Sequence, residues 1–185
     1  MIKISRVIFM LVLSWSISAQ NILVNGEFDA NTDGWSSFET ISWVSDDGAS
    51  ISGNGSMLNT GSFNNNGSFP AISEKFVVKP FYQYLTGASY KVPTGSSVPW
   101  VWYWIYWYDD MDGVIGQSAQ VAADFGVPND SWENLAGMIQ APVDAAMGEL
   151  RIYFQTGAPS NPDTPYGLWD DVFVLEETVF ISGFD

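Results

Sequence analysis

The chain has 185 residues with 21 acidic and 6 basic side chains, a formal net charge of −15, and neither cysteine nor histidine. These absences exclude disulfide scaffolds, thiol chemistry, histidine-based catalytic triads and the commonest zinc ligands. A bound metal would be a hard cation with oxygen ligands, such as calcium. So acidic a surface repels nucleic acid and anionic lipid, and we expect no nucleic-acid partner and no membrane partner.

The first nineteen residues predict a signal peptide. Lys3 and Arg6 form a basic start, the apolar run "VIFMLVLSWSI" follows, and "SISA" offers small residues for cleavage after Ala19. The apolar run is shorter than the roughly 20 residues that a membrane-spanning helix needs. We therefore expect a secreted protein, extracellular or periplasmic, with a signal peptide at 1–19, one domain at 20–177 and a C-terminal tail at 178–185.

Short β-rich runs separated by turn residues make up the domain, without a long stretch of helical periodicity. In chain order the candidate strands are 21–25, 41–45, 56–60, 72–78, 89–93, 100–108, 113–121, 134–140, 148–156 and 168–176. Clusters of Gly, Asn, Asp and Pro, such as "PTGSS" at 93–97, separate them. This pattern predicts an all-β fold, a jelly-roll β-sandwich of two antiparallel sheets.

The run "WVWYWIYWY" at 100–108 is unusual because seven of its nine side chains are aromatic. Successive side chains of a strand point to opposite faces. One face contains both aliphatic residues and is expected to face the core: Val101, Tyr103, Ile105 and Trp107. The other is wholly aromatic: Trp100, Trp102, Trp104, Tyr106 and Tyr108. Either this second face is buried under a loop or another chain, or sugar rings stack on it, with Trp102, Trp104 and Tyr106 as the central ligand-binding residues.

A second candidate strand supplies polar groups. In "LRIYFQ" at 150–155, apolar side chains alternate with Arg151, Tyr153 and Gln155, which are expected to face outward. Guanidinium and amide groups are planar forks suited to pairs of hydroxyls, so these three residues would complete a ligand-binding face. The alternative is an ordinary exposed strand on which Arg151 adds charge. Ser89 and Lys91 are expected to point the same way.

Five motifs in order resemble the CenC-like carbohydrate-binding modules, the jelly rolls of families 4, 9 and 22. They are "NILVNGEFDANTDGW" at 21–35, "YDDMDG" at 108–113, "DSWENLAG" at 130–137, "APVDAAMGELRIYF" at 141–154 and "LWDDVFVLEE" at 168–177. The resemblance extends over residues 21–176, nearly the whole domain. It implies a galactose-binding-like jelly roll that binds an oligosaccharide or polysaccharide without catalysis.

The resemblance also implies a structural calcium ion that ties the first strand to the last. In this chain the site maps onto Glu27 and Asp170, with main-chain oxygens completing the shell and Asp29 as the alternative to Glu27. Asp170 alternates with Val172 and Val174, so we expect its carboxylate to point where those side chains point. A lone buried carboxylate needs a cation or hydrogen-bond donors. The alternative is a carboxylate at the end of a sheet that is satisfied by hydrogen bonds alone.

No class of enzyme finds a full set of residues in this sequence, so we expect no catalysis. A glycoside hydrolase needs two carboxylates beside the sugar, and we expect no Asp or Glu on the outward positions of the two groove strands. The run "DDMDG" at 109–113 lacks the length and the terminal Glu of an EF-hand loop, and predicts a hairpin turn. Two alternatives remain: a surface or adhesion protein whose aromatic face contacts another protein, and a glycoside hydrolase.

Overall fold

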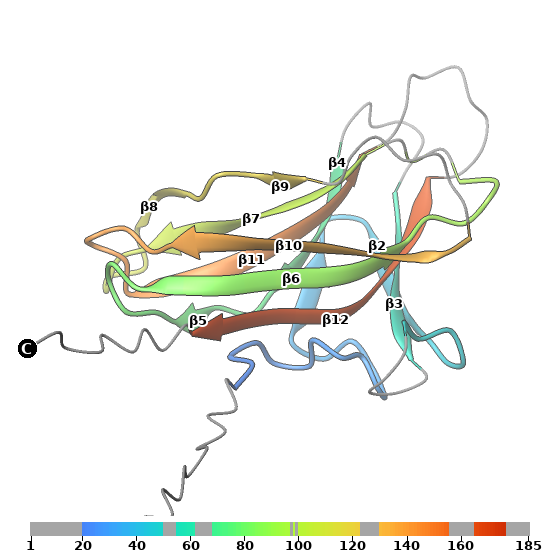
Figure 1. The fold of residues 1–185 in the computed structure, drawn as a ribbon, viewed down its shortest axis with the longest axis horizontal. Coiled ribbons are helices and arrows are strands. Elements are labelled where there is room, and N and C mark those ends of the chain that lie inside the picture. Colours follow the sequence, from blue (N-terminus) through green and yellow to red (C-terminus); the bar gives the residue numbers. More distant parts are fainter. Residues whose placement is uncertain are drawn as a thin grey trace, which may run out of the picture.

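The computed structural model describes residues 20–49, 55–61, 68–96, 98, 100–122, 130–155 and 165–176. The predicted signal peptide and C-terminal tail lie outside these residues. Within them, two antiparallel sheets pack face to face as a sandwich and no helix is present (Figure 1). The predicted all-β class and two-sheet architecture are confirmed. Nothing in these ranges forms a helix of the length and apolarity that crossing a membrane requires.

Each sheet draws its strands from along the whole chain. The seven-stranded sheet contains β1 (Trp35–Ser37), β4 (Ser68–Ser73), β5 (Phe76–Val77), β7 (Trp100–Tyr108), β8 (Val114–Gln117), β9 (Val121–Ala122) and β11 (Met147–Gln155). Its order is β1-β4-β11-β7-β8, with β5 paired to β11 and β9 to β7. The five-stranded sheet contains β2 (Thr40–Val44), β3 (Ser56–Thr60), β6 (Gln83–Lys91), β10 (Trp132–Gln140) and β12 (Tyr166–Glu176). Its order is β10-β6-β12-β3-β2.

The core lies between the two sheets, and β7 shows how alternation builds it. Its predicted inward residues all belong to the buried cluster: Val101, Tyr103, Ile105 and Trp107. The Tyr103 hydroxyl reaches the opposite sheet and donates to the carbonyl oxygen of Thr86 at 3.0 Å. Burial raises the pKa of this hydroxyl to about 12. The inward face of β7 is therefore confirmed, and its other side chains point away from the core.

Some predicted strands differ from those observed. The segment 21–25 makes a single bridge, between Asn21 and Leu175. The side chain of Asn21 replaces further pairing, because its Oδ1 accepts the Val174 N–H at 3.0 Å and its Nδ2 donates to the Val172 carbonyl at 2.9 Å. The predicted strand 72–78 is divided between β4 and β5, and 113–121 between β8 and β9. Side-chain bonds and interruptions of this kind leave no periodic signal in a sequence.

Because of a bulge in β12, the Asp170 side chain lies on the opposite face of the sheet from Val172 and Val174. The register of β12 against β6 shifts after Asp170, and Asp171 has a φ of 45°. Trp169 belongs to the core cluster, and beyond the bulge so do Val172 and Val174. Because neighbouring side chains of a strand alternate, Asp170 points away from the core. The expectation that it points where Val172 and Val174 point is wrong, since the extra residue of the bulge resets the alternation.

Candidate functional site

The six side chains predicted to bind a ligand share the outer face of the seven-stranded sheet. Strands β7 and β11 pair in a register that sets these outward residues opposite one another: Trp100 and Gln155, Trp102 and Tyr153, Trp104 and Arg151, Tyr106 and Glu149. We call the outward side chains of β7 the aromatic row: Trp100, Trp102, Trp104, Tyr106 and Tyr108. Two neighbouring strands therefore bring the predicted aromatic and polar groups together.

The central rings of this face pack against one another. Trp102 stacks on Tyr153 with ring centroids 3.8 Å apart and planes 15° apart. Trp104 meets Tyr153 edge-on at 5.4 Å and lies 4.6 Å from Trp102. Trp102 and Tyr153 are consequently only 8% and 6% exposed, whereas Trp100 at the end of the row is 37% exposed. The outer face is a prepacked aromatic surface, because stacked and edge-to-face pairs fix the rings in place.

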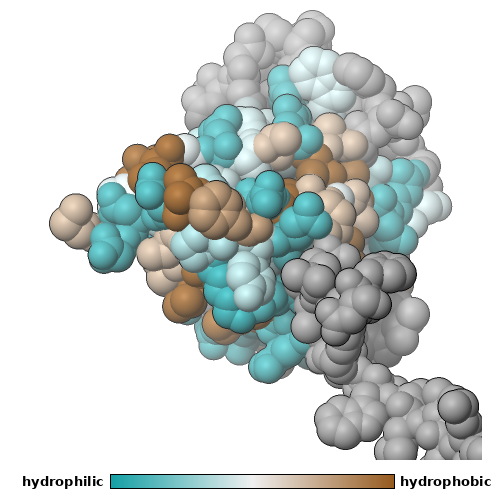
Figure 2. Space-filling view, turned by 60° about the vertical axis from the view of Figure 1, so that its left-hand side comes forward, coloured by the Kyte–Doolittle hydropathy of each residue, from teal (hydrophilic) through white to brown (hydrophobic). Residues whose placement is uncertain are grey.

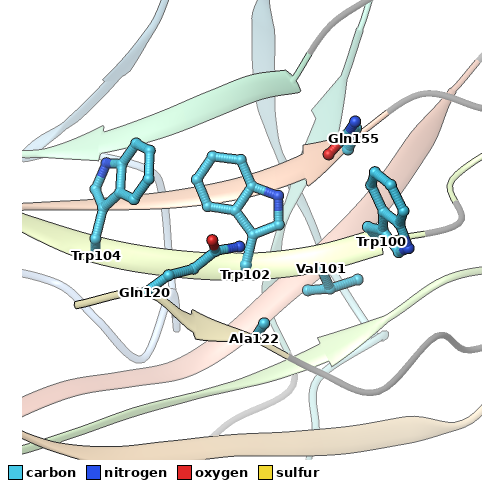
Figure 3. Close-up of a pocket in the computed structure, with 7 residues that line it drawn as sticks. All are labelled: Trp100, Val101, Trp102, Trp104, Gln120, Ala122 and Gln155. Atoms are coloured by element: carbon cyan, nitrogen blue, oxygen red, sulfur yellow. The ribbon is translucent and has the colours of Figure 1, made fainter.

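A pocket of about 400 Å³ opens at the Trp100 end of the aromatic row (Figure 3). It is lined by Trp100, Val101, Trp102, Trp104, Gln120, Ala122 and Gln155. Figure 3 shows the three indoles projecting from β7 to the same side. None of these described lining residues is charged, and the two glutamines supply amide groups. Apolar walls with a few placed polar groups are typical of sites for small ligands.

Four of these lining residues are outside the predicted ligand-binding set: Trp100, Val101, Gln120 and Ala122. Trp100 belongs to the predicted aromatic face but lies at the end of the strand, and Val101 is a predicted core residue. Gln120 lies in the segment between β8 and β9. Alternation cannot be counted through an interrupted strand, so no signal in the sequence identifies Gln120.

Two polar atoms lie within the aromatic surface. The indole N–H of Trp104 is buried and makes no well-formed hydrogen bond among the described residues. Burial raises the pKa of the Tyr153 hydroxyl, while its proximity to the Trp104 indole opposes that rise. Both groups are thus held in largely desolvated surroundings, where a hydrogen bond is stronger than in water.

The opposite end of the aromatic row is covered by cations. The Arg151 guanidinium carbon lies 3.8 Å from the centroid of the Tyr106 ring, and Lys75 Nζ lies 3.5 Å from the centroid of the Tyr108 ring. Arg151 is paired with Glu149, whose Oε1 lies 2.6 Å from both Nε and Nη2. Lys75 pairs with a carboxylate in the turn between β7 and β8. This end of the face is therefore charged, in contrast to the pocket.

Glu149 contradicts the expectation that the two groove strands carry no outward carboxylate. It lies on the outer face opposite Tyr106. The side chain of Glu149 is 12% exposed and that of Arg151 is 20% exposed, so the pair is mostly buried. Alternation alone could have found Glu149, because the predicted strand 148–156 already included it two positions before Arg151.

Ser89 and Lys91, expected to point towards the same face, belong to the other sheet. Both lie on β6, between β10 and β12. Ser89 donates to Asn134 Oδ1 at 2.8 Å, and Lys91 forms an ion pair with Asp47 at 2.7 Å. The expectation was wrong because long-range pairing, which local periodicity does not record, decides which sheet a strand joins.

The acidic run at 109–113 forms a hairpin turn, as predicted. Asp109 Oδ1 accepts the N–H of Met111 at 2.9 Å and the N–H of Gly113 at 2.7 Å. The Asp109 N–H donates to the Gly113 carbonyl at 2.9 Å. The Asp109 carboxylate is thus used to close the turn between β7 and β8.

Asp170 is buried on the outer side of the five-stranded sheet. Its Oδ2 accepts the Ala49 N–H at 2.6 Å and its Oδ1 accepts the Asp171 N–H at 2.7 Å. Burial, together with the negative charges of Asp171 and Asp29, raises the pKa of Asp170 to about 6. Glu27 is exposed. The described part of the chain contains no group of three or more acidic residues that could hold a metal ion, so calcium at Glu27 and Asp170 stays a prediction.

Several solved structures are similar to this fold. The enzymatically active domain of tailspike protein 4 of bacteriophage CBA120 has a TM-score of 0.64 and 11% identity, covering 85% of this chain and 21% of that one. The CBM22-1–GH10 modules of Clostridium thermocellum xylanase 10B, complexed with xylohexaose, have a TM-score of 0.61 and 18% identity, covering 84% and 28%. The CBM22-1 xylan-binding domain of Paenibacillus barcinonensis Xyn10C has a TM-score of 0.61 and 14% identity, covering 86% and 96%.

Carbohydrate-binding modules of families 16 and 61 are also among the structural neighbours. The chain spans about a fifth and a little over a quarter of the first two neighbours, and nearly all of the isolated xylan-binding domain. No family model matches the chain, and no curated protein matches it either. The fold is that of the β-sandwich carbohydrate-binding modules, in agreement with the resemblance seen in the sequence.

Proposed function

We propose that this protein binds a neutral oligosaccharide or polysaccharide in the pocket at Trp100, Trp102 and Trp104, without catalysing a reaction. The observation that carries this proposal is the pocket lining, whose described residues include three indoles and two amides and no charged side chain. A pyranose ring has a face of C–H groups that packs on an indole. Its hydroxyls pair with the donor and acceptor atoms of an amide such as that of Gln120 or Gln155.

The packing of the face supports the same ligand class. Because Trp102, Trp104 and Tyr153 are already held against one another, binding costs little side-chain entropy. The similar structures include a xylan-binding domain and a module in complex with β-1,4-galactotriose. The xylose units of xylan and the galactose units of galactotriose carry no charge. This protein's acidic surface is compatible with such a ligand and unfavourable to an anionic one.

The distribution of carboxylates favours binding over hydrolysis. A glycosidase needs two carboxyl groups roughly 5–10 Å apart on either side of the scissile bond. Among the described residues that line the pocket there is no carboxylate. Glu149 is tied to Arg151 at the other end of the face, and Asp109 closes a turn. These two carboxylates therefore do not form a pair placed across the pocket.

Titration of tryptophan fluorescence with soluble xylan, β-glucan and galactan tests the proposal. We expect a saturable change with at least one of them, because the three indoles of the pocket would be shielded by the bound sugar. A parallel incubation that measures released reducing ends is expected to give none. A protein that responds to no neutral polysaccharide, or that releases reducing sugar, would contradict the proposed function.

We also propose that a calcium ion binds at Asp170, with Glu27 or Asp29 as the second carboxylate. Each Asp170 oxygen accepts one N–H, which leaves lone pairs for a cation. The N-terminal segment runs beside β12, because the Gly26 carbonyl accepts the Val172 N–H at 2.8 Å. A bound cation would offset the cost of the buried carboxylate.

Thermal unfolding in calcium and in chelator tests this ion. At a calcium concentration about a hundred times the dissociation constant, we expect about 2.7 kcal/mol of added stability. Asp170→Ala is expected to abolish this response, and Asp144→Ala, which removes an exposed carboxylate in the β10–β11 turn, is expected to retain it. Identical unfolding curves in calcium and in chelator would remove the ion from the proposal.

We further propose that residues 1–19 direct export and are removed. The basic start, apolar run and small residues before Gln20 support this. Mass spectrometry of the exported protein is expected to give a mature chain that begins at Gln20. An exported chain that retains residues 1–19 would contradict it.

A second candidate function, contact with another protein, is favoured by apolar side chains at one end of the sandwich. Figure 2 shows hydrophobic groups gathered between hydrophilic ones on this side. Exposed apolar residues in its turns and at the start of β8 are Phe81, Tyr82, Met111, Val114 and Val143. The β5–β6 and β10–β11 turns lie together, because the Phe81 N–H donates to the Ala141 carbonyl at 3.0 Å. Sedimentation that gives a monomer at micromolar concentration would exclude self-association through this end.

A further inference from the structure

Two consecutive rings of the aromatic row are covered by basic side chains. Residues 20–185 contain only four basic residues, and two of them, Lys75 and Arg151, lie over Tyr108 and Tyr106. A cation that sits over a ring occupies the surface on which a sugar would stack. A cation therefore lies over the rings of Tyr106 and Tyr108, whereas the pocket ring Trp102 packs against the aromatic rings of Tyr153 and Trp104.

The cover over Tyr106 is held firmly. Two nitrogens of the Arg151 guanidinium lie 2.6 Å from Glu149 Oε1, and a third contact reaches the Tyr108 hydroxyl at 3.5 Å. Hydrogen bonds between ionised groups are the stronger kind, and this pair is mostly withdrawn from solvent. Removing Arg151 from the ring would leave a mostly buried carboxylate without its partner, which is costly. Displacing Arg151 to admit a ligand over Tyr106 would therefore be costly.

The pocket ends where this cover begins. Its lining includes Trp100, Trp102 and Trp104 but neither Tyr106 nor Arg151. At about 3.3 Å per residue, the distance along β7 from Trp100 to Trp104 is about 13 Å, roughly the length of two or three linked pyranose rings.

We propose that Arg151, held by Glu149, forms a barrier that ends the sugar-binding groove at Tyr106. The groove then holds a segment of roughly two or three sugar units along β7, whatever the length of the glycan. This inference rests on the proposed function and gives Arg151 and Tyr106 a different role from the direct ligand contact that the sequence suggested. Arg151 sets the length of glycan that is recognised, and Tyr106 lies beyond the end of the site.

Calorimetry with neutral oligosaccharides of increasing length tests the barrier. We would titrate the protein with xylo-, cello- and β-1,4-galacto-oligosaccharides, from the disaccharide to the hexasaccharide. In a series that binds, affinity is expected to rise up to the trisaccharide and then to change by less than about twofold. Affinity that continues to rise by more than about tenfold up to the hexasaccharide would overturn the inference. Absence of binding to every series would instead contradict the proposed function, and the inference with it.

The double variant Glu149→Gln/Arg151→Ala removes the barrier without leaving an unpaired charge. Its uncovered Tyr106 ring is expected to make the hexasaccharide bind roughly two- to tenfold more tightly than the trisaccharide. Lys91→Ala removes one positive charge from the other sheet and is expected to keep the wild-type plateau. A folded double variant that loses trisaccharide binding would overturn the inference, since Arg151 would then contact the ligand directly.

A crystal structure of the unaltered protein with the hexasaccharide gives a measurement that depends on no variant. Ordered sugar rings are expected over Trp100 to Trp104, with the chain leaving the surface before Tyr106. Ordered sugar over the Tyr106 ring, with Arg151 displaced, would overturn the inference.

Discussion

The two sides of strand β7 have the same kind of residue and different surroundings. On the inner side, Tyr103 and Trp107 are buried among side chains of both sheets. On the outer side, Trp102 is almost as buried, yet it lies outside that cluster and is covered by Tyr153 and Trp104. Burial therefore does not distinguish core from ligand-binding surface in this protein. What distinguishes them is whether the neighbours of a ring come from the opposite sheet or from the same face.

This difference has an energetic meaning. An inner ring is part of the contact between two sheets, so its loss leaves a cavity that the sandwich cannot close easily. An outer ring contacts only its neighbours on the face, and water can fill the space that its removal leaves. Substitutions on the two sides of β7 should thus separate stability from ligand binding.

The largest expected effect is on the inner side. Trp107→Ala is expected to lower the free energy of unfolding by about 3–5 kcal/mol, because it removes a buried indole between the sheets. Urea unfolding followed by circular dichroism measures this loss. A loss below about 1 kcal/mol would mean that Trp107 contributes no more than a surface side chain, and the two sides would not differ.

Trp104→Ala is the matched change on the outer side. We expect it to weaken binding of a neutral polysaccharide by about 1–3 kcal/mol, on the scale of aromatic anchors at binding sites. Its cost in stability should be only about 1 kcal/mol, from lost contact with Trp102 and Tyr153. Phe81→Ala, which removes an exposed ring at the end of the sandwich, serves as the control and should leave binding unchanged. If Trp104→Ala unfolds the protein as severely as Trp107→Ala, both sides of β7 are core.

Tyr103 gives a smaller effect with a pH signature. Its hydroxyl pKa is raised from 10.0 to about 12 in the folded protein by burial. Stability from the neutral hydroxyl is therefore complete below pH 10 and is lost as the pH rises towards 12, because the unfolded chain gives up this proton first. Tyr103→Phe is expected to cost about 1 kcal/mol at neutral pH and to flatten this alkaline loss. Unfolding free energies measured from pH 8 upward, with an unchanged slope in Tyr103→Phe, would contradict it.

Salt is expected to have the smallest effect of all. Since none of the described residues that line the pocket is charged, raising the salt concentration should change the affinity for a neutral polysaccharide by less than about twofold. Fluorescence titrations in low and high salt measure this directly. A large loss of affinity in high salt would indicate that the ligand contacts the charged end of the outer face instead.

The alternation of side chains along a strand predicts the two faces correctly where the strand is regular, and wrongly where a bulge or a break interrupts it. β7 has the predicted bounds and no bulge between Trp100 and Trp107, so both of its faces could be assigned from the sequence. At Asp170 one extra residue reversed the assignment, and no residue type in "WDDV" marks that bulge. The face of Gln120 could not be predicted because this residue lies between two short strands. Glu149 lies on a regular strand, where alternation does assign it to the outer face.

The pairing of strands was the other limit. The sequence predicted that β7 and β11 offer suitable outward side chains, and the register then brings Trp102 and Tyr153 into stacking contact. The same reasoning directed Ser89 and Lys91 to that face, and they lie in the other sheet. Local periodicity reports which side of a strand is apolar, whereas hydrogen bonds between distant segments decide which strands become neighbours.

The position of β12 has a consequence for how the molecule assembles. This strand, the last of the described strands in chain order, lies in the middle of the five-stranded sheet, between β6 and β3. It also holds the first described residues through Asn21. Ribosomes make a chain from its amino end, so β6 and β3 must each wait, with one edge unpaired, until residues 166–176 have emerged. Because non-local pairing of this kind slows folding, the sandwich should form late and cooperatively, after synthesis of the domain is complete.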